Sequence, residues 1–167
     1  GTNYSAIQQA TSRQIGNTAL DQQAFCSPSA IDSFYAQQCY FAYQAVLKTL
    51  HQGQHLQKIW HYIPAINQGE GDQENYRQFC RGREQALLES ELALSHLPAA
   101  TAIGIPDSEA PALFYWLTGP RTGTNVENPR QVSAIKYPRQ YGPAKPNFSR
   151  ATISDCAEQF LISGTAS

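Results

Sequence analysis

Basic and aromatic side chains gather in one proline-rich stretch, residues 127–151, with the sequence ENPRQVSAIKYPRQYGPAKPNFSRA. The stretch contains the cations Arg130, Lys136, Arg139, Lys145 and Arg150, interleaved with Tyr137 and Tyr141, and almost no acid after Glu127. An arginine binds a carboxylate through two parallel N–H donors, and a tyrosine hydroxyl supplies one more donor. The prolines stiffen the backbone, which lowers the entropic cost of holding these side chains. The stretch therefore predicts a site for a small dicarboxylate.

RNA binding is the competing interpretation of interleaved basic and aromatic residues. It needs a broad positive surface, but the 167-residue chain has a formal net charge of −1 and only 15% charged residues. That charge recruits neither nucleic acid nor an anionic membrane. Any affinity for anions must come from the local cluster.

A second group of arginines lies in YRQFCRGR, residues 76–83. Helical spacing places Arg77 and Arg81 on one face and Arg83 on the aromatic side, which we expect to face the interior. A buried arginine needs an anionic partner, because desolvating it unpaired is costly. A snorkelling or ion-paired arginine is the ordinary alternative, and this segment alone favours the ordinary one.

Other constellations give little support for catalysis or metal binding. His51 and His55 have the i, i+4 spacing of two metal ligands on a helix, but a glycine lies between them and no third ligand is in register. We expect them to line a surface together with His61. The serines from Ser163 onward lack the flanking glycines of a nucleophile elbow, and no glycine-rich phosphate loop is present.

The length suits about one domain of average size. The four cysteines form no CxxC pair, which favours reduced thiols and a cytoplasmic location. We find neither a signal peptide nor an apolar run long enough to span a membrane.

Apolar periodicity predicts a helix over residues 32–51 and a second helix from Asp72 to about Leu92. Between them, β-branched and aromatic residues predict a strand over 56–66. Two further strands, 100–105 and 112–118, are expected to be joined by a hairpin-like turn.

A strand over 130–138 is expected to open a second unit, with Arg130 and Lys136 on one face and Tyr137 on the other. A terminal strand follows in EQFLISG, residues 158–164. This order predicts an α+β two-layer sandwich. We divide the chain into an irregular lead-in with one strand near residues 24–26 (1–30), a complete domain (31–120) and the beginning of a second domain (127–167).

Five segments together resemble the chorismatase family, whose members include 3-hydroxybenzoate synthases and proteins called pteridine-dependent dioxygenase-like. The segments are LQKIWHYIPAIN, YRQFCRGR, LPAATAIGI, ENPRQVSAIKYPRQYGPAKPNFSRA and LISGTAS, in order over about residues 32–167. The resemblance implies two Rid-like (chorismate mutase-like) domains with the active site between them. It also implies cleavage of chorismate to pyruvate and a dihydroxycyclohexadiene or 3-hydroxybenzoate, without a metal or organic cofactor.

The resemblance also implies a set of substrate-binding residues. Arginines and tyrosines would hold the two carboxylates, and the glycine-rich end would border the ring. Carried onto this sequence, the set is Arg83, Tyr115, Tyr137, Arg139, Tyr141, Gly164, Thr165 and Ala166. No catalytic residue can be assigned, because the glutamate that the family uses as its acid belongs to a segment after ISGTAS.

We therefore expect a partial chorismatase, inactive if the chain really ends at residue 167. The alternative is a non-catalytic Rid-type module that binds a small molecule or assembles as a homo-oligomer such as a trimer. A pterin-dependent oxygenase has little support, since no triad of two histidines and a carboxylate is apparent.

Overall fold

The computed structural model describes most of the chain from residue 31 onward. It covers residues 31, 33–48, 50, 54–90, 92, 96–108, 110–154, 156 and 158–164, and the backbone of 12–14. The strand predicted near residues 24–26 lies outside these residues.

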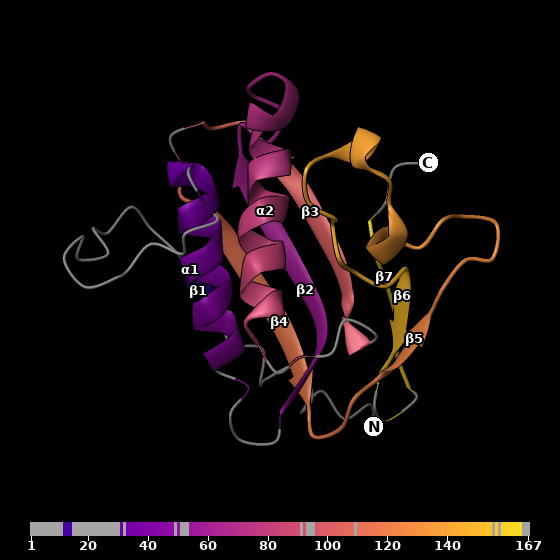
Figure 1. Cartoon of the computed structure of the whole chain (residues 1–167). Helices are drawn as coiled ribbons and strands as arrows, with labels where there is room; N and C mark the ends of the chain where they lie inside the picture. The colour runs from indigo at the N-terminus through magenta and orange to yellow at the C-terminus, as the bar shows by residue number, and fades with distance from the viewer. Residues whose placement is uncertain are drawn as a thin grey trace.

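Two helices pack together on one face of a four-stranded sheet (Figure 1). Helix α1 spans Phe34–Lys48 and helix α2 spans Asn75–Leu88, so both predicted helices are confirmed, with shorter ends. Helix α1 buries a stripe that includes Tyr43 and Val46, and α2 buries Phe79 and Leu87 against it. The periodicity that predicted the helices is the one that makes this core.

The four-stranded sheet has the order β1-β4-β2-β3. Its strands are β1 (Ser12–Gln14), β2 (His55–Pro64), β3 (Ala99–Ile105) and β4 (Leu113–Gly119). Central β2 runs parallel to β3 and antiparallel to β4. Its side chains alternate, so that Ile59 and Ile63 enter the core under the helices while Trp60 and Tyr62 lie on the opposite face.

The predicted hairpin between the third and fourth strands is wrong, because β2 lies between β3 and β4. Residues 106–112 need to cross only two inter-strand spacings, about 10 Å, which a segment of this length spans easily. The local turn residues predicted that the chain reverses but not which strand each arm would pair with.

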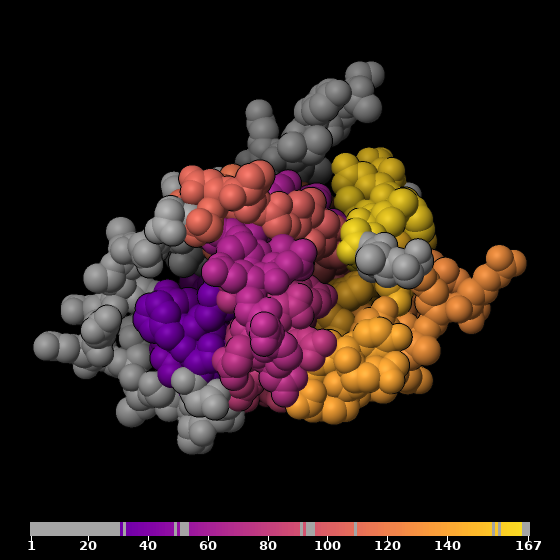
Figure 2. All heavy atoms as spheres, turned by 90° about the horizontal axis from the view of Figure 1, so that it is seen from above, coloured from indigo at the N-terminus to yellow at the C-terminus, as the bar shows by residue number. Residues whose placement is uncertain are grey.

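A second, antiparallel sheet of three short strands follows in the order β5-β6-β7. Its strands are β5 (Thr124–Val126), β6 (Ala151–Ile153) and β7 (Phe160–Ile162), the last confirming the terminal strand. A parallel bridge between Ala99 and Ser149 joins this sheet to the edge of β3. In the space-filling view from above, the orange and yellow C-terminal residues lie together on one side of the molecule (Figure 2).

The predicted strand over 130–138 is wrong. Residues 130–138 hold a turn and the 3-10 helix Ala134–Lys136, and a second 3-10 helix, Arg139–Tyr141, follows them. Pro129 and Pro138 bracket the region and cannot donate to a strand ladder. The alternating faces inferred for this segment therefore do not exist, and its side chains are placed by individual contacts.

No helix in the described part of the chain is long and apolar enough to cross a membrane. Cys39, Cys80 and Cys156 are free thiols, the first two buried between the helices and the third exposed.

Candidate anion-binding site

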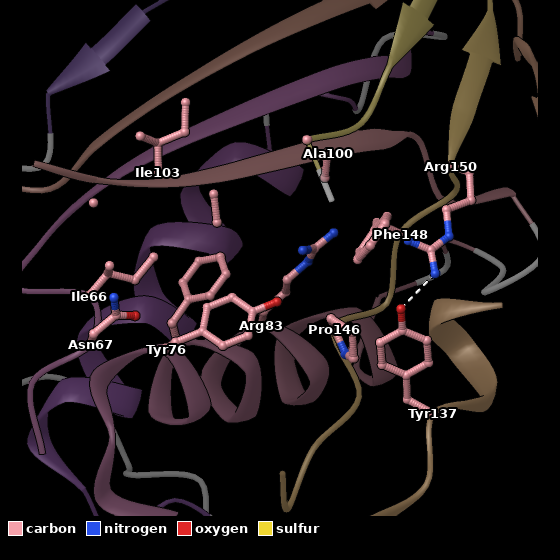
Figure 3. Close-up of a pocket in the computed structure, with 14 residues that line it drawn as sticks. Ile66, Asn67, Tyr76, Arg83, Ala100, Ile103, Tyr137, Pro146, Phe148 and Arg150 are labelled. Carbon is pink, nitrogen blue, oxygen red and sulfur yellow. Dashed lines mark hydrogen bonds between the residues drawn. The ribbon is translucent and has the colours of Figure 1, made fainter. Parts of the chain in front are cut away.

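A pocket of about 520 Å³ lies where helix α2, the outer edge of β3 and the segment before β6 meet (Figure 3). Its walls come from five separate parts of the chain. The lining residues are Ile66, Asn67, Tyr76, Phe79, Arg83, Ala100, Ala102, Ile103, Gly104, Tyr137, Pro146, Phe148, Arg150 and Gly164. The pocket is therefore mostly apolar and aromatic, with two cationic side chains.

Arg83 reaches the pocket from the buried face of α2, as helical spacing predicted. Its side chain is 3% exposed, and its Nη2 donates to the carbonyl of Asn147 over 2.6 Å. The guanidinium carbon lies 5.4 Å from the ring centroid of Tyr43, a cation–π distance. The Nε atom is buried without a hydrogen-bond partner.

Arg150, the residue just before β6, lines the pocket and is 8% exposed. Its Nη2 donates to the hydroxyl of Tyr137 over 2.6 Å and to the carbonyl of Val132 over 3.1 Å. Its guanidinium carbon lies 5.5 Å from the ring centroid of Phe148. Nε and Nη1 are both buried and have no partner.

Neither guanidinium group has a carboxylate of the described residues within ion-pair distance. Burying an arginine donor unpaired is costly, and an anion with oxygen acceptors removes that cost. In Figure 3, Arg83 and Arg150 lie on either side of the Phe148 ring. The geometry suits a ligand with two carboxylates and an apolar body between them.

The aromatic wall beside Arg83 remains uncharged at neutral pH. Burial raises the pKa of the Tyr76 hydroxyl well above its usual value, and the neighbouring Cys80 thiol adds to the shift. Tyr76 therefore presents a neutral ring and hydroxyl to the pocket, and it does not oppose an anion there.

The chain is similar to known proteins of one family. The family model described as "Chorismatase FkbO/Hyg5-like, N-terminal" matches residues 4–118. The chain belongs to the chorismatase family. It is 41% identical over 119 residues to a 3-hydroxybenzoate synthase of Streptomyces hygroscopicus, and 39% identical over 100 residues to a chorismatase of Streptomyces rapamycinicus.

These matches cover 66% and 58% of the chain but only 34% and 29% of the relatives. The matched region thus spans about a third of the curated relatives' length. A crystal structure of a chorismatase superposes with a TM-score of 0.70 at 35% identity, covering 77% of this chain and 40% of that one. This likeness confirms the predicted α+β fold.

The pocket brings together three of the residues expected from the chorismatase resemblance: Arg83, Tyr137 and Gly164. Tyr141 stands just outside the lining, 58% exposed, with its ring centroid 5.0 Å from that of Tyr137. Arg139 is also outside the lining. It forms a two-point ion pair with Asp72, at 2.6 and 3.2 Å, which lowers the pKa of that carboxyl. Thr165 and Ala166 lie outside the described residues.

Tyr115 lies on the other face of the four-stranded sheet. With Trp60, Tyr62 and Leu113 it lines a shallow depression of about 380 Å³, away from the helices. Strand alternation accounts for this position, because neighbouring Phe114 and Trp116 are buried. Tyr115 does not reach the pocket that holds Arg83 and Arg150.

Arg150 and Phe148 do not belong to the substrate-binding set that the resemblance implies. Arg150 is one of five cations in the basic stretch, and nothing in the sequence ranks it above the other four. The distinguishing fact is burial, which follows from its position where the second sheet meets the edge of β3.

His61 lies in the core rather than on a surface as expected. Its ring is 1% exposed, bonded at Nδ1 to the Thr101 carbonyl and at Nε2 to the Tyr43 hydroxyl. Burial, followed by the charge of Arg83, holds the pKa of His61 well below its usual value. In the part of the chain that the structure describes, no group of three His, Cys, Asp or Glu could hold a metal ion.

Proposed function

We propose that the pocket binds chorismate and serves a chorismatase-type reaction that forms pyruvate and a dihydroxycyclohexadiene or 3-hydroxybenzoate. The observation that carries the proposal is the pair of buried guanidinium groups with unpartnered nitrogens, Arg83 Nε and Arg150 Nε and Nη1. Membership in the family supports the choice of substrate.

Chorismate has one carboxylate on a six-membered ring and another on an enolpyruvyl side chain, so its two charges flank an apolar ring system. Arg83 and Arg150 would each bind one carboxylate. Phe79 and Phe148 would contact the ring, and Gly164 would leave room beside it. Since burial strengthens charge-assisted hydrogen bonds, each arginine would contribute strongly to affinity.

Cleavage to the diol requires a proton donor at the enolpyruvyl methylene carbon, after which water adds to the resulting cation. The adduct then breaks its bond to the ring oxygen, releasing pyruvate and the dihydroxycyclohexadiene. Formation of 3-hydroxybenzoate in place of the diol corresponds to the loss of one further water. No carboxylic acid or imidazole is among the described lining residues. The described residues would thus hold and orient the substrate. The acid would come from outside these residues, because the family resemblance implies a glutamate in a segment after ISGTAS.

Calorimetric titration with chorismate tests the binding step. We expect binding by the native chain and a loss of about tenfold or more in affinity for Arg83→Met and Arg150→Met. Arg130→Met is the matched control, because Arg130 is exposed in the same basic stretch and does not line the pocket. Equal affinity in all four proteins, or no binding by the native chain, would contradict the proposal. Pyruvate release from chorismate, measured on the same protein, tests turnover separately.

A Rid-type assembly module is the second candidate, favoured by the aromatic face around Tyr115. Trp60, Tyr62, Leu113 and Tyr115 leave an apolar depression open on the side of the sheet without helices, and Tyr115 is 38% exposed. Exposed apolar patches of this kind mark association surfaces. Light scattering would report a trimer that Tyr115→Asp disrupts. A monomer at all concentrations would exclude this candidate.

A further inference from the structure

Lys58 is a buried cation on the side of the sheet opposite the helices. Its side chain is 2% exposed, and its Nζ donates to the Thr101 hydroxyl over 2.8 Å and to the Ile162 carbonyl over 2.7 Å. No carboxylate in the described residues lies within ion-pair distance of Lys58. Lysine is almost never fully buried without a charged partner, so a specific role is expected of it.

The surroundings of Lys58 are the junction of the two sheets. Side-chain hydroxyls accept hydrogen bonds from backbone amides at the edge of β3 there. The Ala99 amide donates to Thr152 Oγ1 and the Ala100 amide to Ser163 Oγ, both over 2.8 Å. Only one backbone bridge, Ala99 to Ser149, joins the sheets in the part of the chain that is described. The placement of β7 against β3 therefore depends on side chains more than on a strand ladder.

Thr101 connects Lys58 to the wall of the pocket. Its hydroxyl oxygen accepts from Lys58 and also from the backbone amide of Gly164, over 2.9 Å. Gly164 lines the pocket in close contact with this threonine, since a Cβ added there would lie 2.8 Å from Thr101 Cγ2. With both acceptor sites of the hydroxyl used, its orientation is determined by the lysine and the glycine together.

We propose that Lys58 is a positioning residue of the binding pocket. Its ammonium group ties β7 to the four-stranded sheet at Ile162 and orients the Thr101 hydroxyl that holds Gly164. Lys58 touches no ligand, but without it the Gly164 wall would lose its fixed distance from β3. The structural part of this inference rests on the hydrogen bonds alone. Its consequence, the shape of the pocket that chorismate would meet, rests on the proposed function.

The structural part is tested without ligand, through the Gly164 amide resonance in nuclear magnetic resonance spectra. Lys58→Met keeps the length of the side chain but removes its donors, and Thr101→Val keeps the shape of threonine but removes the acceptor. We expect both variants to shift the Gly164 amide resonance and raise its temperature coefficient. Thr101→Ser, which retains the hydroxyl, should restore the native values. An unchanged Gly164 resonance in either folded variant, Lys58→Met or Thr101→Val, would overturn the proposal.

The functional part is tested by titration with chorismate. We expect Lys58→Met and Thr101→Val to weaken binding about fivefold, with little added effect when combined, and Thr101→Ser to bind as the native chain does. Lys48→Met, an exposed lysine at the end of α1, is the matched control. If the native chain fails to bind chorismate while the amide resonance still responds, the proposed function fails and the positioning role stands. Native affinity in folded Lys58→Met would contradict the positioning role.

Discussion

Arg150 and Tyr137, thirteen positions apart, meet at the pocket through a 2.6 Å hydrogen bond from the guanidinium Nη2 to the tyrosine hydroxyl. The guanidinium carbon also lies 5.7 Å from the Tyr137 ring centroid. Neither residue belongs to a regular element, so this contact, with the bond to the Val132 carbonyl, holds the arginine in place. The two other nitrogens of Arg150, Nε and Nη1, are buried without a hydrogen-bond partner.

Tyr137→Phe should therefore weaken chorismate binding by about threefold to tenfold, because Arg150 loses one of the two acceptors that orient it. Calorimetric titration measures the effect. Tyr62→Phe, on the far face of the sheet, is the control and should bind normally. If Tyr137→Phe binds chorismate as tightly as the native chain does, the hydrogen bond does not orient Arg150 for binding.

Buried His61 should make the fold sensitive to acid. Its folded-state pKa is depressed, so as the pH falls below about 6.5 the unfolded chain takes up a proton that the folded chain refuses. The free energy of unfolding should fall by up to about 1.4 kcal/mol per pH unit from this residue alone. Urea unfolding at pH 7 and pH 5 measures the slope.

His61→Phe should reduce that slope, although it lowers stability at pH 7 by leaving the Tyr43 hydroxyl and Thr101 carbonyl without their partner. The same acid sensitivity in His61→Phe as in the native chain would assign it to other groups.

Gly82 permits the close packing of α2 on α1. A Cβ at this position would lie 2.2 Å from the Ala36 carbonyl oxygen and 2.8 Å from the Tyr40 amide nitrogen. Both contacts are backbone, so the helices would have to separate. Gly82→Ala should cost about 3 kcal/mol, despite the better helix propensity of alanine.

Gly71→Ala provides the comparison, since Gly71 has a φ of +55° but open space around it. Its cost should be about 1 kcal/mol, from backbone strain alone. Denaturant unfolding of both variants separates the two causes. A Gly82→Ala protein as stable as the native one would show that the helices can move apart without loss.

Lys58 should give the protein an unusual alkaline response. Burial lowers its pKa to about 8 from 10.5, so between those values the unfolded chain holds more protons than the folded one. The free energy of unfolding contributed by this residue therefore rises with pH across that window. Buried thiols such as Cys39 and Cys80, whose pKa values are raised, act in the opposite direction.

The comparison with Lys58→Met isolates the lysine, because the thiols are present in both proteins. Unfolding measured at pH 7.5 and 9.5 should show the native chain gaining stability relative to the variant. A constant difference between the two proteins across this range would mean that Lys58 titrates normally.

The sequence by itself determined the elements with strong periodicity and the family. The stripes of α1 and α2, the apolar run of β2 and the inward side of Arg83 follow from residue spacing, because spacing reports which face of an element is buried. The basic stretch also predicted an anion site, since arginines and tyrosines with few acids have few other uses. The motif series predicted the chorismatase family, which the comparisons confirmed.

Only the tertiary structure decided which of the candidate residues meet. It placed β2 between β3 and β4, turned Tyr115 to the far face, paired Arg139 with Asp72 and buried Arg150 instead. It also joined Lys58 to Gly164 through Thr101. These outcomes depend on contacts between segments 40 or more positions apart, or on single side-chain bonds in loops. Local periodicity carries no information about such contacts, because it records burial and not the identity of the neighbour.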